Sequence, residues 1–367
     1  MVKFDEIIHA SLEWTTTVLF RPFNIKKWVI LAFIAILAGA ISGGNSFRMD
    51  SPVDKAYHNQ SAEKDAKIES KEKASVPAGT KSFSDIKNEL NLFFAQLTSA
   101  PGIFFIIGGI ALVIIVLMIF IWLDSRFTFI FLQDVCANDA SIKLPFTQNK
   151  KIGNSLFSFN AVFFFLCMLI TIILLYYFAK AIIAIMGPAA FESILATGMF
   201  MKVFLPCVPY FLFFLLLLLL AGIVYFVIND FVILVMFKEK INVLKAFSVA
   251  LGIIKNNKAN ICVYCLIKIG LSICAGIIYW IIYFIATVAI VFPAIMVVSL
   301  SAFFYKTMPL AYQPVFILIC VIIAIPILLF FWYCFLCLSL PFAVFFRTFS
   351  IKFFGKLNSR YDLFKYS

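Results

Sequence analysis

Several apolar runs in this sequence are longer than the ~20 residues that a helix needs to cross the hydrocarbon core of a membrane. They lie near residues 156–186, 204–237 and 313–346, and a still longer run covers 260–299. A segment in lipid must satisfy its backbone polar groups internally, and these runs are continuous, unlike the alternating pattern of barrel strands. The sequence therefore predicts an all-α, polytopic membrane helix bundle.

The composition agrees with a membrane protein and argues against nucleic-acid binding. Hydrophobic residues make up 64% of the chain and charged residues 13%, whereas soluble domains are about half apolar and a quarter charged. The net charge is +12, but the basic residues lie mainly in short segments beside apolar runs. Lysine and arginine there set topology and meet anionic lipid. We expect membrane lipids, and no nucleic acid, as partners.

The distribution of charge predicts six transmembrane spans with both termini in the cytoplasm. Basic residues outnumber acidic ones in segments 1–27, 134–153, 238–258 and 347–367, whereas the 44–100 loop holds equal numbers. The positive-inside rule places the four basic segments in the cytoplasm. The predicted parts are a first elbow and span (1–44), an extracytoplasmic polar loop that ends in an amphipathic helix (45–100), span two (101–140), two elbow-hairpin units (141–240 and 241–347) and a basic cytoplasmic tail (348–367).

The fifth run is too long for a simple span. As one helix, residues 260–299 would be about 60 Å long, twice the thickness of the hydrocarbon core. Proline removes a backbone donor and clashes with the preceding turn. We therefore expect Pro293 to break this helix, leaving a tilted span and an interfacial or re-entrant segment.

The boundaries suggest an internal repeat. Phe127, Phe231 and Phe342 occupy equivalent positions near the predicted cytoplasmic ends of spans two, four and six. Amphipathic or basic segments adjoin the starts of spans one, three and five, at 4–20, 142–153 and 241–256. We predict three parallel pseudo-repeats, each an interfacial amphipathic elbow followed by a helical hairpin. In the first elbow the helical spacing places these residues near one face: Phe4, Ile7, Ile8, Ser11, Thr15, Val18 and Leu19.

Four boundary motifs carry a resemblance to a known family: Leu19–Trp28, Ser125–Leu132, Gly153–Phe159 and Asn229–Val232. In this order they resemble an uncharacterised family of multi-pass membrane proteins from bacteria and archaea. The likeness covers most of the chain outside 45–100 and implies no activity. A looser likeness to the membrane domain of some glycerophosphodiester phosphodiesterases implies membrane architecture only, because the sequence shows no phosphodiesterase catalytic domain.

Charged residues inside predicted spans are the candidate functional residues, because such groups are costly in a membrane. Four of them, Asp124, Arg126, Asp230 and Lys268, fall about 10–15 Å inside the predicted cytoplasmic boundary. Their charges sum to zero, so we predict a buried charge network with Asn229 between spans two, four and five. It is either a structural clasp or a substrate or ion site. We expect Lys180 and Arg347 to be interfacial residues that extend toward water.

Two cysteine pairs, Cys262/Cys265 and Cys334/Cys337, have the spacing of some metal sites. Such sites usually form in turns, so cysteines within apolar helices favour packing, and we expect no metal and no cofactor. The two histidines, His9 and His58, lack an identifiable nucleophile and carboxylate context. Nucleophile-elbow, zinc-protease and P-loop motifs are absent from the sequence. We predict no catalytic residue.

The favoured function is a non-enzymatic integral membrane protein of the cytoplasmic (inner) membrane that organises partner proteins or surrounding lipid. Partners besides lipid would be other membrane proteins or a second copy of the chain. The alternative is a transporter or lipid-handling protein that uses the charge cluster. Six lysines in boundary segments are predicted to contact lipid headgroups: Lys26, Lys27, Lys150, Lys151, Lys245 and Lys255.

Overall fold

The computed structural model describes residues 3–41, 100–186, 199–309 and 312–366. The described residues form helices and short connections without any strand, which confirms the all-α prediction. By contacts the chain divides into two units, Arg48–Ile119 and the remainder. The described part of the smaller unit is the first half of helix α4. The helices are α1 (Phe4–Phe20), α2 (Ile25–Leu37), α4 (Ala100–Ala137), α5 (Lys143–Gln148), α6 (Lys150–Met186), α7 (Met199–Val227), the π-helix η1 (Ile228–Val232), α8 (Ile233–Glu239), α9 (Val243–Asn256), α10 (Lys258–Thr307), α11 (Gln313–Leu338), α12 (Leu340–Leu357) and the 3₁₀ turns η3 (Ser359–Tyr361) and η4 (Leu363–Tyr366).

Five helical segments in the described part of the chain are long and apolar enough to cross a membrane: Ile107–Ala137, Lys150–Ile182, Cys207–Glu239, Lys258–Thr307 and Gln313–Leu357. Their most apolar windows are at most 6% buried, so the protein itself does not cover them. This confirms the prediction of a multi-pass membrane protein. The predicted first span corresponds to α2, whose 13 residues extend only about 20 Å. The predicted 45–100 loop lies outside the described residues, apart from Ala100.

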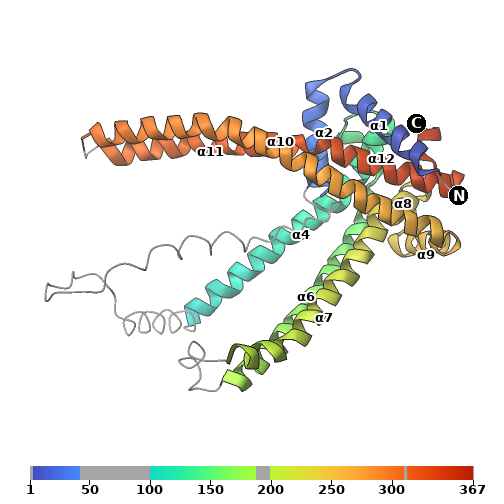
Figure 1. Cartoon of the computed structure of the whole chain (residues 1–367), viewed down its shortest axis with the longest axis horizontal. Coiled ribbons are helices and arrows are strands. Elements are labelled where there is room, and N and C mark those ends of the chain that lie inside the picture. Colours follow the sequence, from blue (N-terminus) through green and yellow to red (C-terminus); the bar gives the residue numbers. More distant parts are fainter. Residues whose placement is uncertain (1–2, 42–99, 187–198, 310–311, 367) are drawn as a thin grey trace, which may run out of the picture. The chain divides into compact units, whose positions relative to one another are not determined.

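Two pairs of long helices lie side by side, α6 with α7 and α10 with α11 (Figure 1). Each pair has the antiparallel arrangement of a hairpin. The first predicted hairpin would join spans one and two through residues outside the described ranges. The threefold repeat therefore stays a prediction.

The expectation that Pro293 breaks the fifth run is wrong. Helix α10 continues through Pro293 for 50 residues, from Lys258 to Thr307, or about 75 Å. Proline interrupts one hydrogen bond but is tolerated within membrane helices, where local adjustments satisfy the freed backbone groups. Pro293 is exposed on the helix surface.

Helix α1 buries the face that its sequence predicts. Its fully buried residues are Ile7, Ser11, Thr15, Val18 and Leu19. This face packs on α12, with the rings of Phe4 and Phe353 stacked at 5.6 Å between centroids. The indole Nε1 of Trp14 also donates to the carbonyl oxygen of Val135, at 2.9 Å. Protein, rather than lipid, covers the apolar face of the first elbow.

The last predicted boundary also differs from the structure. Helix α11 ends at Leu338, eight residues before the predicted end of span six, and α12 begins after Ser339. The predicted basic tail starts inside α12, where Phe349, Phe353 and Phe354 are completely buried. Apolar residues at helical spacing share this segment with Lys352 and Lys356, and the apolar stripe packs inside the protein. The two lysines give the segment the sequence pattern of a basic tail.

Candidate functional site

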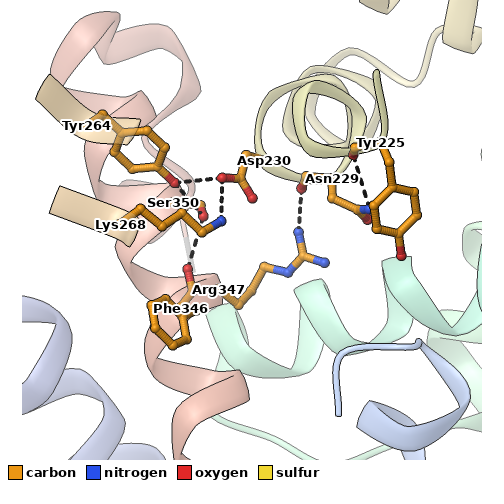
Figure 2. Close-up of polar contacts among 8 residues, drawn as sticks. All are labelled: Tyr225, Asn229, Asp230, Tyr264, Lys268, Phe346, Arg347 and Ser350. Carbon is orange, nitrogen blue, oxygen red and sulfur yellow. Dashed lines mark hydrogen bonds and ion pairs between the residues drawn. The ribbon is translucent and has the colours of Figure 1, made fainter. Parts of the chain in front are cut away.

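The site begins at a π-helix. At η1 the backbone N–H of Ile233 bonds to the carbonyl oxygen of Ile228, five residues earlier, so the helix wall holds one extra residue. Such bulges interrupt the regular bonding pattern and are frequent at functional sites. The carbonyl oxygen of Asn229 accepts a hydrogen bond from Nη1 of Arg347 on α12, at 2.8 Å (Figure 2). The Asn229 side chain donates to the carbonyl oxygen of Tyr225, at 3.2 Å.

Asp230 lies at the centre of a buried polar cluster. Its Oδ2 accepts from Nζ of Lys268 at 2.5 Å and from the hydroxyl of Tyr264 at 2.9 Å. That hydroxyl lies 2.9 Å from Oγ of Ser350, which is also 3.0 Å from the carbonyl oxygen of Phe346. The side chains come from η1, α10 and α12 (Figure 2), so the cluster joins three helices.

Aromatic rings surround this cluster and exclude water from it. Tyr264 is completely buried and stacks on Phe349 and Phe353, with centroid distances of 5.3 and 4.1 Å. The Lys268 ammonium lies 5.0 Å from the ring centroid of Phe226. Asp230 and Lys268 are 2% and 5% exposed. Removing one partner of such a pair leaves an uncompensated charge in a medium of low dielectric constant, so the loss of either partner alone is expected to destabilise this arrangement strongly.

Arg347 is not the interfacial residue that we expected. It is 3% exposed, and its Nε has no hydrogen-bond partner among the described residues. The reason is its position: Leu340, Ala343, Val344 and Arg347 follow helical spacing on the buried face of α12. Sequence reasoning misses this because a lone arginine at the end of an apolar run has the pattern of a membrane boundary.

The five residues of the predicted network do not form one cluster. The structure brings Asp230 and Lys268 into contact and places Asn229 beside them. Asp124 lies instead near the end of α2, where its Oδ1 is 2.7 Å from the position that a Cβ on Gly39 would occupy. Gly39 has a φ of +61°, so this glycine serves both the backbone conformation and the close approach.

Arg126 also lies outside the cluster. Its Nη2 donates to Oδ1 of Asn154 on α6, at 2.8 Å. Its guanidinium carbon is 4.7 Å from the ring centroid of Trp122 and 4.8 Å from that of Phe146. A functional role for the predicted network stays a prediction, now limited to Asp230, Lys268 and their neighbours.

Two residues of the cluster, Tyr264 and Ser350, are not among those that the sequence predicts. Tyr264 stands four residues before Lys268, on the same face of α10, and this spacing is a usable signal. Ser350 gives no signal, because its partners belong to distant parts of the chain.

The predicted headgroup lysines divide into two groups. Lys27 donates from Nζ to the carbonyl oxygen and Oδ1 of Asn138, at 3.0 and 2.6 Å, and so binds the turn after α4. The other five are exposed: Lys26, Lys150, Lys151, Lys245 and Lys255.

The cysteine pairs show no metal-site geometry. Cys262 is exposed and Cys265, Cys334 and Cys337 are partly buried. Across the described ranges, no three histidine, cysteine, aspartate or glutamate side chains converge as metal ligands would.

A family model described as a family of unknown function, DUF7544, matches residues 4–364. The chain belongs to this family, and the match covers nearly its whole length. Comparison with curated proteins and with solved structures gave no match. The looser likeness to the membrane domain of glycerophosphodiester phosphodiesterases stays a prediction.

Proposed function

We propose that the protein is a non-enzymatic integral membrane protein that organises partner proteins or the lipid around it. The observation that carries this proposal is the contrast between a closed polar cluster and long uncovered helices. Asp230, Lys268 and Tyr264 satisfy one another between η1, α10 and α12. The most apolar windows of the candidate spans are at most 6% buried, so they offer apolar surface to other molecules.

Two surface hollows in the described part of the chain lie away from the charge cluster. One cavity of about 290 Å³ is lined by Gln133, Cys136, Ala137, Gln148, Phe237, Lys238, Lys240 and Leu363. Another of about 410 Å³ lies between α10 and α11, lined by Ser301, Ala302, Tyr305, Phe316, Ile317, Cys320, Val321 and Ala324. Asp230 and Lys268 line neither of them. The support for a clasp is the burial of both charged partners, Asp230 and Lys268, whereas a ligand site needs at least one residue open to its ligand.

Six spans in three pseudo-repeats, with both termini in the cytoplasm, form the topological part of this proposal. Helix α1 packs on α12, which favours placing the two ends of the chain on the same side of a membrane. In that arrangement an even number of crossings separates them. The described part of the chain holds five candidate spans, an odd number, so we propose a sixth crossing by the segment that contains α2.

A transporter is the second candidate, and the π-helix beside a buried ion pair favours it. Bulges of this kind and ionisable residues inside membrane helices often mark ion pathways. In this case the Asp230–Lys268 pair would exchange protons or ions during transport.

Flux measurements on purified protein in liposomes separate the two candidates. For an organising protein, proton and cation flux equals that of empty liposomes, and the purified protein retains specific lipids or partners when extracted with its native membrane. A flux that Asp230→Asn abolishes, in a variant that still folds, would overturn the proposal in favour of transport.

A further inference from the structure

Arg126 is a buried cation without an acidic partner. It is 7% exposed, yet none of the ion pairs between described residues includes it. Its one hydrogen bond to a described side chain goes to the neutral amide of Asn154. A cation within a membrane helix is unfavourable unless an anion or several strong acceptors compensate it.

The hydrogen-bonding capacity of Arg126 is mostly unused. A guanidinium has five N–H donors. Nη2 bonds to Asn154, the buried Nε has no acceptor among the described residues, and Nη1 makes no hydrogen bond with them. The Asn154 side chain is exposed and uses Oδ1 to accept, so its Nδ2 remains able to donate. Nη1 of Arg126 on α4 and Nδ2 of Asn154 on α6 are therefore the donors left for one acceptor-rich ligand.

The surroundings hold the guanidinium in place. It lies between the rings of Trp122 and Phe146, which limit its rotation. A Cβ on Gly153 would lie 3.1 Å from Cγ of Arg126, so the side chain rests directly against the first turns of α6. Those turns also carry the exposed Lys150 and Lys151. The beginning of a helix is electropositive, so all of these features favour an anion at this position.

We propose that Arg126 and Asn154 form a binding site for a phosphate group, with the phosphodiester of a membrane lipid headgroup as its source. Phosphate oxygens accept several N–H bonds at once and match the planar fork of arginine. The inference deepens the proposed function, on which it rests for the source of the phosphate. A soluble phosphate would offer the same chemistry, and the experiment distinguishes the two.

The test is lipid binding to delipidated full-length protein, measured by native mass spectrometry with three probes. These are phosphatidylglycerol, diacylglycerol without a phosphate, and inorganic phosphate as a competitor. We expect one tightly bound phosphatidylglycerol, much weaker binding of diacylglycerol, and no competition by millimolar inorganic phosphate. Competition by inorganic phosphate would show that the site takes a soluble phosphate, and this result would overturn the lipid assignment.

Three variants assign the binding to the site. Arg126→Gln should weaken phosphatidylglycerol binding about tenfold or more, equal to 1.4 kcal/mol or above. Arg126→Lys keeps the charge and loses the planar fork of donors. Its affinity for phosphatidylglycerol should lie between those of the wild type and Arg126→Gln. Lys258→Gln removes an exposed charge at the start of α10 and serves as the control. Unchanged binding in Arg126→Gln would overturn the proposal.

Folding and the broader function are checked separately. If Arg126→Gln does not fold, the wild-type protein and Arg126→Lys still give a test, because a ligand that binds the native state raises Tm. Phosphatidylglycerol should then raise Tm of the wild-type protein more than that of Arg126→Lys, and equal shifts would contradict the site. Wild-type protein that retains neither lipid nor partner contradicts the proposed function itself, whatever the variants do.

Discussion

Two buried cations, Lys268 and Arg126, meet opposite surroundings. Lys268 contacts the carboxylate of Asp230 inside a cluster that three helices enclose. Arg126 has a single neutral acceptor, two aromatic rings and an exposed amide beside it. The protein supplies the counter-charge for the first cation. The second is arranged for an anion from outside the chain.

The difference matters because both positions cost solvation energy. A buried pair with hydrogen-bonded partners is compensated, whereas a lone cation in a low-dielectric region is not. We therefore expect a substitution in the enclosed pair to change the stability of the protein. A substitution of Arg126 should change how much lipid adds to that stability.

The largest expected effect follows from breaking the enclosed pair. Asp230→Leu leaves the Lys268 ammonium buried without a partner and should destabilise the protein by about 3–5 kcal/mol. Adding Lys268→Met should restore much of that loss, because an apolar pair of similar volume is compatible with the site. Denaturant unfolding in detergent measures both variants. Equal destabilisation in the single and double variants would contradict the ion-pair account.

A smaller effect is expected when the pair loses a supporting hydrogen bond. Tyr264→Phe keeps the stacking on Phe349 and Phe353 but removes the hydroxyl that donates to Asp230. We expect a loss of about 1–2 kcal/mol in the free energy of unfolding, since a buried charged acceptor loses one donor. Tyr283→Phe, which removes the hydroxyl of an exposed tyrosine on the same helix, is the matched control. A loss no larger than that of the control argues against the proposed role of the hydroxyl.

The effect of Arg126→Gln should depend on lipid. Without phospholipid the variant removes an uncompensated cation, so its stability should lie within about 1 kcal/mol of wild type. With phosphatidylglycerol the wild-type protein gains stability and the variant does not, because only the former binds the phosphate. Thermal unfolding with and without lipid measures this. An equal gain in both proteins contradicts the phosphate site.

The smallest effect is expected at the C-terminal turn, which is partly open to water. The Tyr361 hydroxyl donates to Oε1 of Glu239 at 2.7 Å. Burial, then this hydrogen bond and the charge of Glu239, raise the pKa of Tyr361 to about 12. The neutral phenol is favoured in the folded state, so its contribution is present below pH ~10 and is lost as the pH rises toward 12. Unfolding across this window should show a loss of stability that Tyr361→Phe reduces; an unchanged pH profile in the variant would count against it.

Hydropathy predicted the long helices and the face of α1, because both depend on local patterns. It did not predict that α12 is buried, because an apolar stripe that faces lipid has the same sequence pattern as one that packs against protein. Phe349, Phe353 and Phe354 therefore looked like part of a basic tail. Helix α10 runs through Pro293, because local adjustments in a membrane helix satisfy the backbone groups that proline frees. The sequence pattern does not show these adjustments.

The charge network shows the same limit. Asp124, Arg126, Asp230 and Lys268 share a predicted depth in the membrane, but depth does not determine which way each side chain points around its helix. Asp230 and Lys268 face each other, whereas Asp124 faces Gly39 and Arg126 faces Asn154. The π-helix at η1, which changes the direction of Asp230, has no recognisable signal in the sequence.

The protein neutralises Lys268 with its own Asp230, and we propose that lipid phosphate neutralises Arg126. The most direct measurement is bound phosphatidylglycerol per protein for the wild type, Arg126→Gln and the Asp230→Leu/Lys268→Met double variant. We expect Arg126→Gln to lose the bound lipid and the double variant to retain it. Loss in the double variant with retention in Arg126→Gln, or retention in both, would contradict the claim.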